Sequence, residues 1–136
     1  MHMNDFGPRP LTMDVVKAAL NNNNYRQTIW SGEHLQMTLM TIRTGDDIGL
    51  EVHPNTDQFL FVAEGLGMAV MGADRDSLIT QPIFCEHVVF VPAGTYHNII
   101  NTGNRALRLI SVYAPPAHPH GTVHRTKEIA MREEHD

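Results

Sequence analysis

Four polar residues in two stretches of this sequence carry side chains that often bind divalent metal ions. Glu51 and His53 lie two positions apart in one apolar run, and Gln58 opens the next run after a Pro-Asn-Thr-Asp turn. His97 opens another apolar run further along the chain. Because residues two apart on a strand point to the same face, Glu51 and His53 should point together, and Gln58 can face them across the turn. A carboxylate, two imidazoles and an amide from three strands would suit a divalent metal ion.

A β-rich framework is needed to bring these residues together, and the hydrophobic pattern predicts one. The run LQMTLMTI at 35–42 alternates, so that Met37 and Leu39 share one face while Gln36 and Met40 share the other. Similar runs occur at 25–30, 49–53, 58–64, 68–71, 84–91, 97–101 and 107–113, whereas 72–81 is a polar stretch. About eight or nine short strands with frequent Gly, Pro, Asn and Asp turns are typical of an all-β sandwich or barrel.

The two ends of the chain do not follow the strand pattern. Residues 1–10 carry two prolines and a glycine and are predicted to form an extended arm. A short helix should follow at 13–20, capped by Thr12. Three prolines in 114–124 exclude a central strand, so this tail should lie extended over its own barrel or over a partner. A short terminal helix is predicted at 126–134.

The length of 136 residues fits a single domain, covering 1–136. We divide it into an N-terminal arm and helix at 1–24, a β-barrel at 25–113, and a Pro-rich tail with a terminal helix at 114–136. The polar tail is rich in histidine, and these side chains are expected to be solvated: His118, His120, His124 and His135.

Composition and charge exclude several classes of function. The formal net charge of −5 leaves no basic patch for nucleic acid, and no apolar run approaches the roughly 18–20 residues of a membrane span. The N-terminus lacks the basic and apolar regions of a signal peptide. The single cysteine, Cys85, excludes an internal disulfide and is expected to be a buried strand residue. We therefore expect a cytoplasmic protein with no nucleic-acid or membrane partner.

The spacing of the two polar stretches resembles the two motifs of the cupin family, G-x5-H-x-H-x3,4-E-x6-G and G-x5-P-x-G-x2-H-x3-N. The first motif aligns with Gly45, Glu51, Val52, His53, Gln58 and Gly65. The second aligns with Pro92, Gly94, His97 and Asn101, and Glu86 stands where the family has its leading glycine. The resemblance implies a cupin-type double-stranded β-helix, also called a jelly-roll barrel, with one short helix near each end of the chain.

The resemblance also implies a metal site at Glu51, His53, Gln58 and His97. Glu51 stands in place of a family histidine, and Gln58 in place of the family glutamate, so the single carboxylate has moved across the site. One nitrogen donor is thereby exchanged for oxygen, which favours Fe(II), Mn(II) or Zn(II) over copper. The alternative is that the altered motif no longer binds metal, and that Glu51 and His53 form an ordinary hydrogen-bonded pair. Asp57 is a rival ligand, but strand alternation turns it to the opposite face from Gln58.

Two functions agree with this resemblance, because cupins of similar size include dioxygenases, isomerases, lyases and binding modules. The first is a metal-dependent enzyme acting on a small polar metabolite. No acid or base is identified for it, although Tyr96 and His34 are candidates if the fold brings them close. The second is a non-catalytic module that binds a sugar or another small ligand, with or without metal. The resemblance further predicts a homodimer.

Overall fold

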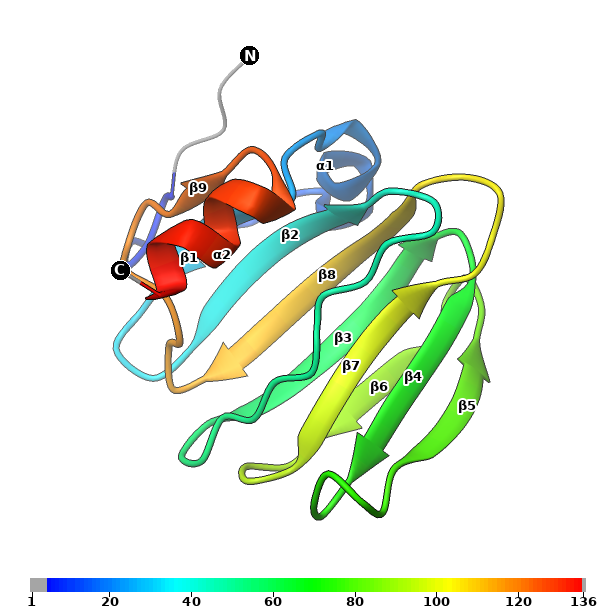
Figure 1. The fold of residues 1–136 in the computed structure, drawn as a ribbon. Helices are drawn as coiled ribbons and strands as arrows, with labels where there is room; N and C mark the ends of the chain where they lie inside the picture. The colour runs from blue at the N-terminus through cyan, green and yellow to red at the C-terminus, as the bar shows by residue number, and fades with distance from the viewer. Residues whose placement is uncertain (1–4, 136) are drawn as a thin grey trace.

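Two antiparallel sheets face each other across the interior of the protein, with a short helix near each end of the chain (Figure 1). The structure is a computed structural model that describes residues 5–135. The larger sheet has the strand order β6-β3-β8-β2-β1-β9, and the smaller sheet has the order β5-β4-β7. The strands are β1 (Arg26–Ser31), β2 (Gln36–Ile42), β3 (Asp57–Glu64), β4 (Gly67–Gly72), β5 (Ile79–Ile83), β6 (Val88–Val91), β7 (Tyr96–Asn101), β8 (Leu107–Ala114) and β9 (Val123–His124).

The helices are α1 (Val15–Asn21) and α2 (Lys127–His135), so the predicted all-β architecture with a short helix near each end is confirmed. Within residues 5–135, neither helix has the length and apolar character needed to cross a membrane. Residues 1–4 of the predicted arm and the side chain of His135 lie outside the part of the chain that the structure describes.

Four details of the strand prediction are wrong, and three of them concern the edge of a sheet. Residues 49–53 contribute one isolated bridge, between Glu51 and His97, instead of a strand. β5 begins inside the stretch 72–81 that was predicted to be polar and without a strand. Four of its five residues are exposed, so buried and exposed residues do not alternate along it. β9 lies in the Pro-rich tail and pairs with β1 at the edge of the larger sheet. Cys85 lies exposed in the turn before β6, not buried in a strand.

The register of the larger sheet divides the interior into a polar end and an apolar end. Gln36, Tyr113 and Gln58 are paired across β2, β8 and β3, and all three are buried. Four residues further along β2, Met40 pairs with Leu109 instead. Because alternate residues of a strand face the same side, polar side chains gather at one end of the barrel and apolar ones at the other.

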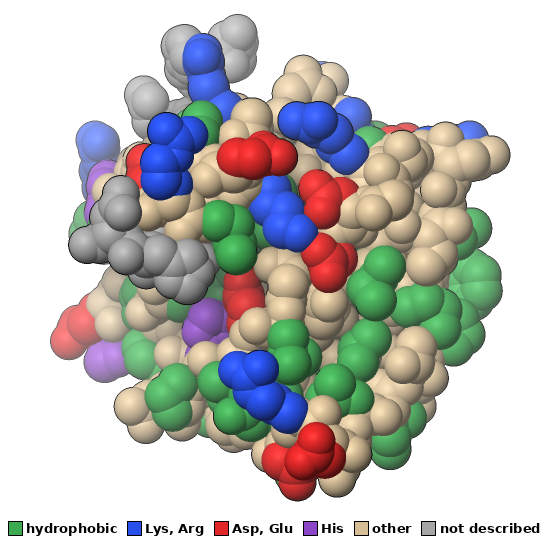
Figure 2. All heavy atoms as spheres, in the orientation of Figure 1, with side chains coloured by type: hydrophobic (Ala, Val, Ile, Leu, Met, Phe, Trp, Pro, Cys, Tyr) green, Lys and Arg blue, Asp and Glu red, His purple; other side chains and the backbone are tan. Residues whose placement is uncertain are grey.

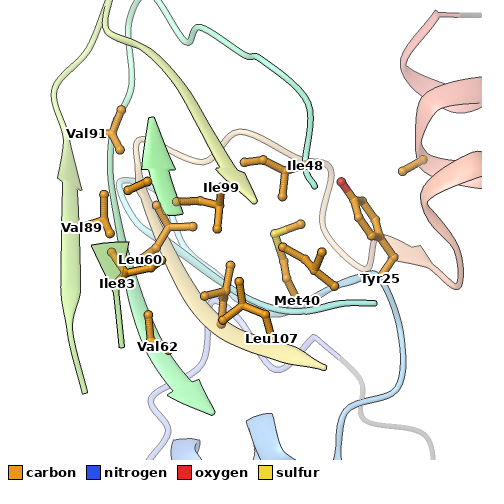
Figure 3. Packing of buried hydrophobic residues seen from close by; sticks show 14 residues of the cluster. Tyr25, Met40, Ile48, Leu60, Val62, Ile83, Val89, Val91, Ile99 and Leu107 are labelled. Atoms are coloured by element: carbon orange, nitrogen blue, oxygen red, sulfur yellow. The ribbon is translucent and has the colours of Figure 1, made fainter. Parts of the chain in front are cut away.

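The apolar end contains the main hydrophobic core. Figure 3 shows Met40, Leu60 and Leu107 of the larger sheet and Ile99 of the smaller sheet pointing toward one another, each at most 1% exposed. Burial of each such side chain stabilises the fold by about 1.5–3 kcal/mol. This packed end holds the strands rigidly and so positions the polar residues further along them.

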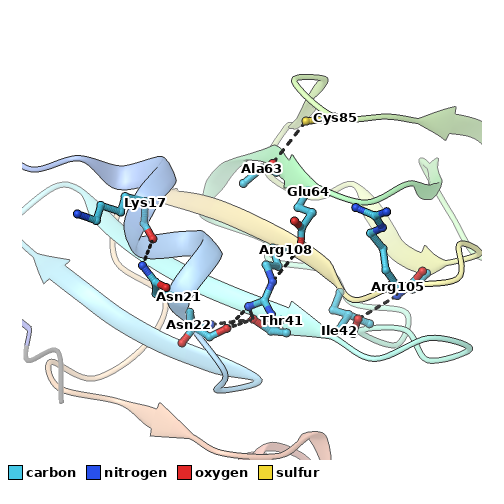
Figure 4. A network of polar contacts seen from close by, with 11 residues as sticks. Lys17, Asn21, Asn22, Thr41, Ile42, Ala63, Glu64, Cys85, Arg105 and Arg108 are labelled. Atoms are coloured by element: carbon cyan, nitrogen blue, oxygen red, sulfur yellow. Dashed lines mark hydrogen bonds and ion pairs between the residues drawn. The ribbon is translucent and has the colours of Figure 1, made fainter. Parts of the chain in front are cut away.

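α1 covers the outer face of the larger sheet and is attached to it at its C-terminal end (Figure 4). The backbone carbonyl of Asn22 accepts hydrogen bonds from Thr41 Oγ1 at 2.8 Å and from the guanidinium of Arg108 on β8. The helix begins one residue after Asp14, whose side chain caps it, so the prediction of Thr12 as the N-cap was wrong. A carboxylate at this position satisfies a free backbone N–H of the first turn.

The Pro-rich tail and residues 5–10 of the N-terminal arm lie on their own barrel. Gln36 is fully buried and holds the tail with three hydrogen bonds: Nε2 donates to the His118 carbonyl at 2.7 Å, and Oε1 accepts from the N–H groups of Ala117 and His118 at 3.0 Å. The Asp5 carboxylate accepts from Gly121 N at 3.1 Å, which joins the arm to the tail. The tail therefore crosses the polar end of the barrel and brings His118 and His124 there.

Glu86 has a strained backbone that explains the glycine of the family motif. Its φ is +72°, in the left-handed region that side chains with a Cβ avoid. Glu86→Gly should therefore raise the free energy of unfolding by about 1 kcal/mol, measured by urea denaturation. Glu33→Gly is the matched control, because Glu33 is an exposed turn residue without a positive φ. Glycine at this position should lower the free energy of unfolding of the protein. Equal losses in both variants would contradict this explanation.

Candidate metal centre

The loop between β2 and β3 runs beside β7 and brings the two motif stretches into contact. Glu51 N donates to the His97 carbonyl, and His97 N donates to the Glu51 carbonyl, both at 2.9 Å. Gly94 N also donates to the His53 carbonyl at 2.9 Å. These backbone hydrogen bonds align the loop antiparallel to the start of β7, so the side chains of both stretches enter the same end of the barrel.

Glu51, His53 and His97 form a compact cluster of potential metal ligands. One ligand atom from each residue lies within 4.8 Å of the other two. Glu51 Oε2 and His53 Nε2 are 3.2 Å apart, and the two imidazole centroids are separated by 5.5 Å. His97 is buried, whereas the side chains of Glu51 and His53 are 21% and 25% exposed. The cluster is therefore reachable from solvent through Glu51 and His53.

His97 presents one ring nitrogen to this cluster in a form that can bind metal. Its Nδ1 lies 3.1 Å from the Thr95 carbonyl, to which only a protonated nitrogen can donate. Its Nε2 is buried and makes no hydrogen bond with any residue that the structure describes. Burial lowers the pKa of His97, although the Thr95 carbonyl and Glu51 act in the opposite direction. The ring is therefore neutral near pH 7, with the lone pair of Nε2 available.

Gln58 lies at the same end of the barrel, on β3, and is 5% exposed. Its Nε2 donates to Ser111 Oγ at 2.9 Å, while its Oε1 is buried and has no hydrogen-bond partner among the described residues. A buried amide oxygen without a partner is costly, which suggests that it binds something else. Asp57 does face the other way, as predicted: its Oδ1 accepts from Ala93 N at 2.8 Å on the exposed surface.

Arg26 provides the main electrostatic partner of Glu51 and was not predicted as a site residue. It is 2% exposed, and its guanidinium lies 3.8 Å from Glu51 Oε1. Burial by itself raises the pKa of Glu51, but the hydrogen bond to His53 and the charge of Arg26 outweigh this effect and lower the pKa below its usual value. Glu51 is therefore an anion near pH 7. A charged residue within the otherwise uncharged run 25–30 was the signal that could have revealed Arg26.

Three further residues extend this polar end, and two of them correct a prediction. The Tyr113 ring packs edge-on against His53 at 5.8 Å and against His118 at 5.2 Å. His124 is 4% exposed and lies 3.3 Å from Arg26 through its Nδ1. His118 is partly buried, and its Nε2 makes no hydrogen bond with the described residues. His118 and His124 are thus interior residues, contrary to the expectation of solvated tail histidines, whereas His120 is exposed.

The two candidate acid–base residues, His34 and Tyr96, make their contacts outside the ligand cluster. His34 is 85% exposed and lies near the carboxylate of Glu33 at 3.5 Å, on the surface. Tyr96 begins β7, and its ring packs under the guanidinium of Arg75 at 5.6 Å. Neither residue has a described contact with Glu51, His53 or His97, so their proposed participation gains no support.

The donor set fits a divalent metal ion. The cluster offers one carboxylate oxygen and the nitrogen of a neutral imidazole, with a second imidazole beside them. Two imidazoles and one carboxylate are the ligands of non-haem metal sites that keep open positions for substrate. The Thr95 carbonyl supports His97 in the way that outer residues usually orient a metal-binding histidine. The unpartnered Oε1 of Gln58 gives a further neutral donor at the same end of the barrel.

Comparison with known proteins agrees with the fold and with the motif stretches. Residues 38–113 match the family model described as the cupin domain. The chain is 48% identical over 133 residues to the uncharacterised protein YrkC of Bacillus subtilis, covering 97% of this chain and 72% of YrkC. It is 34% identical over 113 residues to the uncharacterised protein L612 of Acanthamoeba polyphaga mimivirus, covering 82% of this chain and 69% of L612.

Among solved structures, the crystal structure of BH2720 from Bacillus halodurans is similar throughout. Its sequence is 52% identical, its TM-score is 0.94, and the match covers 95% of this chain and 98% of that chain. This similarity and the family match confirm the predicted jelly-roll fold with two short helices.

Proposed function

This chain belongs to the cupin family, and from that we propose that it is a metal-dependent enzyme acting on a small polar metabolite. The observation that carries the proposal is the convergence of Glu51, His53 and His97, whose ligand atoms lie within 4.8 Å of one another. The names of the relatives above state no function, so the proposal depends on this geometry and on the chemistry of the residues.

Each residue has a separate role in this proposal. Glu51 supplies the negative charge, His53 and His97 supply nitrogen donors, and Gln58 supplies its unpartnered Oε1. Such a set favours Fe(II), Mn(II) or Zn(II). A bound ion would polarise substrate oxygens or support reaction with dioxygen. Because the side chains of Glu51 and His53 are partly exposed, a small substrate can reach the site from their side.

Metal analysis of the purified protein tests the proposal directly. We expect about one divalent ion per chain, measured by inductively coupled plasma mass spectrometry after purification without chelator. His97→Ala should lose the ion, because it removes the buried neutral donor. His34→Ala is the matched control, since this histidine is 85% exposed, and it should retain the ion. Protein that neither retains a divalent ion nor binds one on titration would remove the metal-dependent function.

A non-catalytic binding module is the second candidate, and one observation favours it. The titratable groups next to the cluster are poorly suited to proton transfer near pH 7. Burial raises the pKa of Tyr113 above its usual value, and burial, with the charge of Arg26, lowers the pKa of His118 to about 3. Incubation of metal-loaded protein with small metabolites separates the candidates: consumption of a substrate indicates an enzyme, and saturable binding without consumption indicates a module.

We also propose a homodimer formed through the outer face of the larger sheet. A row of apolar side chains crosses the strands there, in the order Phe90, Phe59, Val112 and Met37, as strand pairing shows. Phe90 is 67% exposed and contacts Phe59 with ring centroids 5.8 Å apart. The other three side chains of the row are partly buried. A row of apolar side chains that remains partly exposed is typical of an interface. In contrast, acidic and basic side chains are mixed on the face with α2, without one dominant sign (Figure 2).

Light scattering tests the dimer. The wild type should have twice the mass of one chain at about micromolar concentration, and Phe90→Glu should shift it toward the monomer because a charge would enter the apolar contact. Phe84→Glu is the control, since Phe84 is 49% exposed but lies in a turn away from this row. A monomeric wild type would exclude the dimer.

We further propose a cytoplasmic location, where the exposed Cys85 would remain a free thiol.

A further inference from the structure

His53 is the one proposed metal ligand that belongs to neither a strand nor a β-bridge. It lies in the loop between β2 and β3, and its side chain is 25% exposed. Two of its side-chain contacts are with other ligands, Glu51 Oε2 at 3.2 Å and the His97 ring at 5.5 Å. These residues would themselves bind the ion, so they cannot fix the His53 ring independently of it. A metal ligand in a loop therefore needs support from outside the cluster.

Tyr113 provides such support. Its ring meets the His53 ring edge-on, with the centroids 5.8 Å apart and the planes at 84°. Tyr113 is 1% exposed and lies on β8 in the larger sheet, where it pairs with Gln36 on one side and Gln58 on the other. A side chain enclosed in this way has little freedom to move, and edge-to-face ring pairs are favourable. Tyr113 is therefore a fixed surface against which the His53 ring is held.

His118 extends this support to the Pro-rich tail. Its ring meets the Tyr113 ring edge-on, with the centroids 5.2 Å apart and the planes at 80°. Its Nε2 makes no hydrogen bond with the described part of the chain, so this side chain acts through ring packing. Gln36 holds the His118 backbone at its carbonyl, at 2.7 Å, and at its N–H, at 3.0 Å. The tail thus adds a third ring to a series of His53, Tyr113 and His118, which we call the ring series.

We infer that the tail is energetically coupled to the metal centre, with Tyr113 and His118 as positioning residues that hold His53 as a ligand. This inference rests on the proposed metal function. Opening of the tail would remove His118 from Tyr113, loosen the His53 ring and lower the affinity for the ion. Coupling between two equilibria is reciprocal, so a bound ion must lower the population of the open tail by the same factor.

Titration of chelator-treated variants with Zn(II) tests the ring series. Tyr113→Leu should lower the affinity by at least about tenfold and His118→Ala by at least about threefold, because each removes one ring. Tyr113→Phe and His118→Phe keep a ring and should stay within about twofold of the wild type. His120→Ala is the matched control, because this tail histidine contacts the Gly7 carbonyl of the arm at 2.8 Å, and it should bind like the wild type. Equal losses in His118→Phe and His118→Ala would show that the His118 nitrogen itself is needed, and would overturn the inference.

Amide hydrogen exchange of the wild type, followed by NMR, tests the coupling without any substitution. The N–H groups of Ala117 and His118 both donate to Gln36 Oε1 at 3.0 Å, so their exchange reports opening of the tail. Zn(II), which is diamagnetic, should slow both by at least about threefold. It should not change the Gly103 N–H, which lies in the turn between β7 and β8. A wild type that does not bind Zn(II) removes the proposed function, whereas bound Zn(II) with unchanged exchange at 117 and 118 removes only this inference.

Discussion

Glu51→Gln should lower the affinity for a divalent ion by at least about 100-fold, whereas Gln58→Ala should lower it by less than about tenfold. Glu51 is the single anion of the ligand cluster, and its pKa is held below the usual value by His53 and Arg26 despite burial. Its loss leaves the ion facing Arg26 with neutral donors alone. Gln58 provides one neutral oxygen, which a water molecule can replace. Titration of chelator-treated protein with Mn(II) or Zn(II) measures both affinities.

Glu64→Gln is the matched control for this comparison. Glu64 pairs with Arg108 at 3.2 Å, so its replacement also breaks an Arg–Glu contact, but one on the outer side of the sheet. It should leave metal affinity unchanged. Equal losses of affinity for Glu51→Gln and Gln58→Ala would show that the carboxylate has not taken over the role of the family glutamate.

Acid should destabilise the metal-free protein through His118. Burial is the main cause, and the charge of Arg26 the next, that lower the pKa of His118 from the usual 6.5 to about 3. Between these two values the unfolded chain binds a proton that the folded chain does not. The free energy of unfolding therefore falls as the pH falls, by up to about 1.4 kcal/mol per pH unit for this one group. Above about pH 6.5, His118 is neutral in both the folded and the unfolded chain, so this loss of stability is absent.

The change with pH can be assigned to His118 by comparing variants in the presence of chelator. Between about pH 6.5 and about pH 5, the wild type should lose about 2 kcal/mol more than His118→Asn in urea denaturation. His97 and Glu51 also have lowered pKa values, but they titrate in both proteins and cancel in this difference. His34→Asn should behave like the wild type, because His34 is 85% exposed. The same pH dependence in His118→Asn and wild type would contradict this assignment.

Local alternation explains why part of the candidate site could be predicted from the sequence. Glu51 and His53 are two residues apart and share a side of the extended backbone, and their side chains do meet at 3.2 Å. Gln58 and Asp57 are adjacent on β3, and they face opposite sides as expected. The alignment of both stretches with a family pattern then placed His97 beside them, which the structure confirms.

That Arg26, Tyr113 and His118 lie at the same site could not be predicted, because they come from segments that only strand pairing and the tail bring together. Arg26 meets His124 through the pairing of β1 with β9, and these residues are 98 positions apart. His118 reaches the interior because Gln36 binds the backbone of a Pro-rich segment whose composition is typical of an exposed tail. Composition reports the average environment of a segment, whereas a few buried hydrogen bonds decide where this one lies.

The sequence by itself determined the jelly-roll architecture and the group of Glu51, His53 and His97, because strand periodicity and motif spacing are local properties of the chain. Only the tertiary structure decided which charges surround that group. The pairing of distant strands places the positive charge of Arg26 beside Glu51, and the fixed tail adds His118 with an unpartnered nitrogen. Electrostatic interactions depend on distance in space and on burial, and neither follows from the separation of residues along the chain.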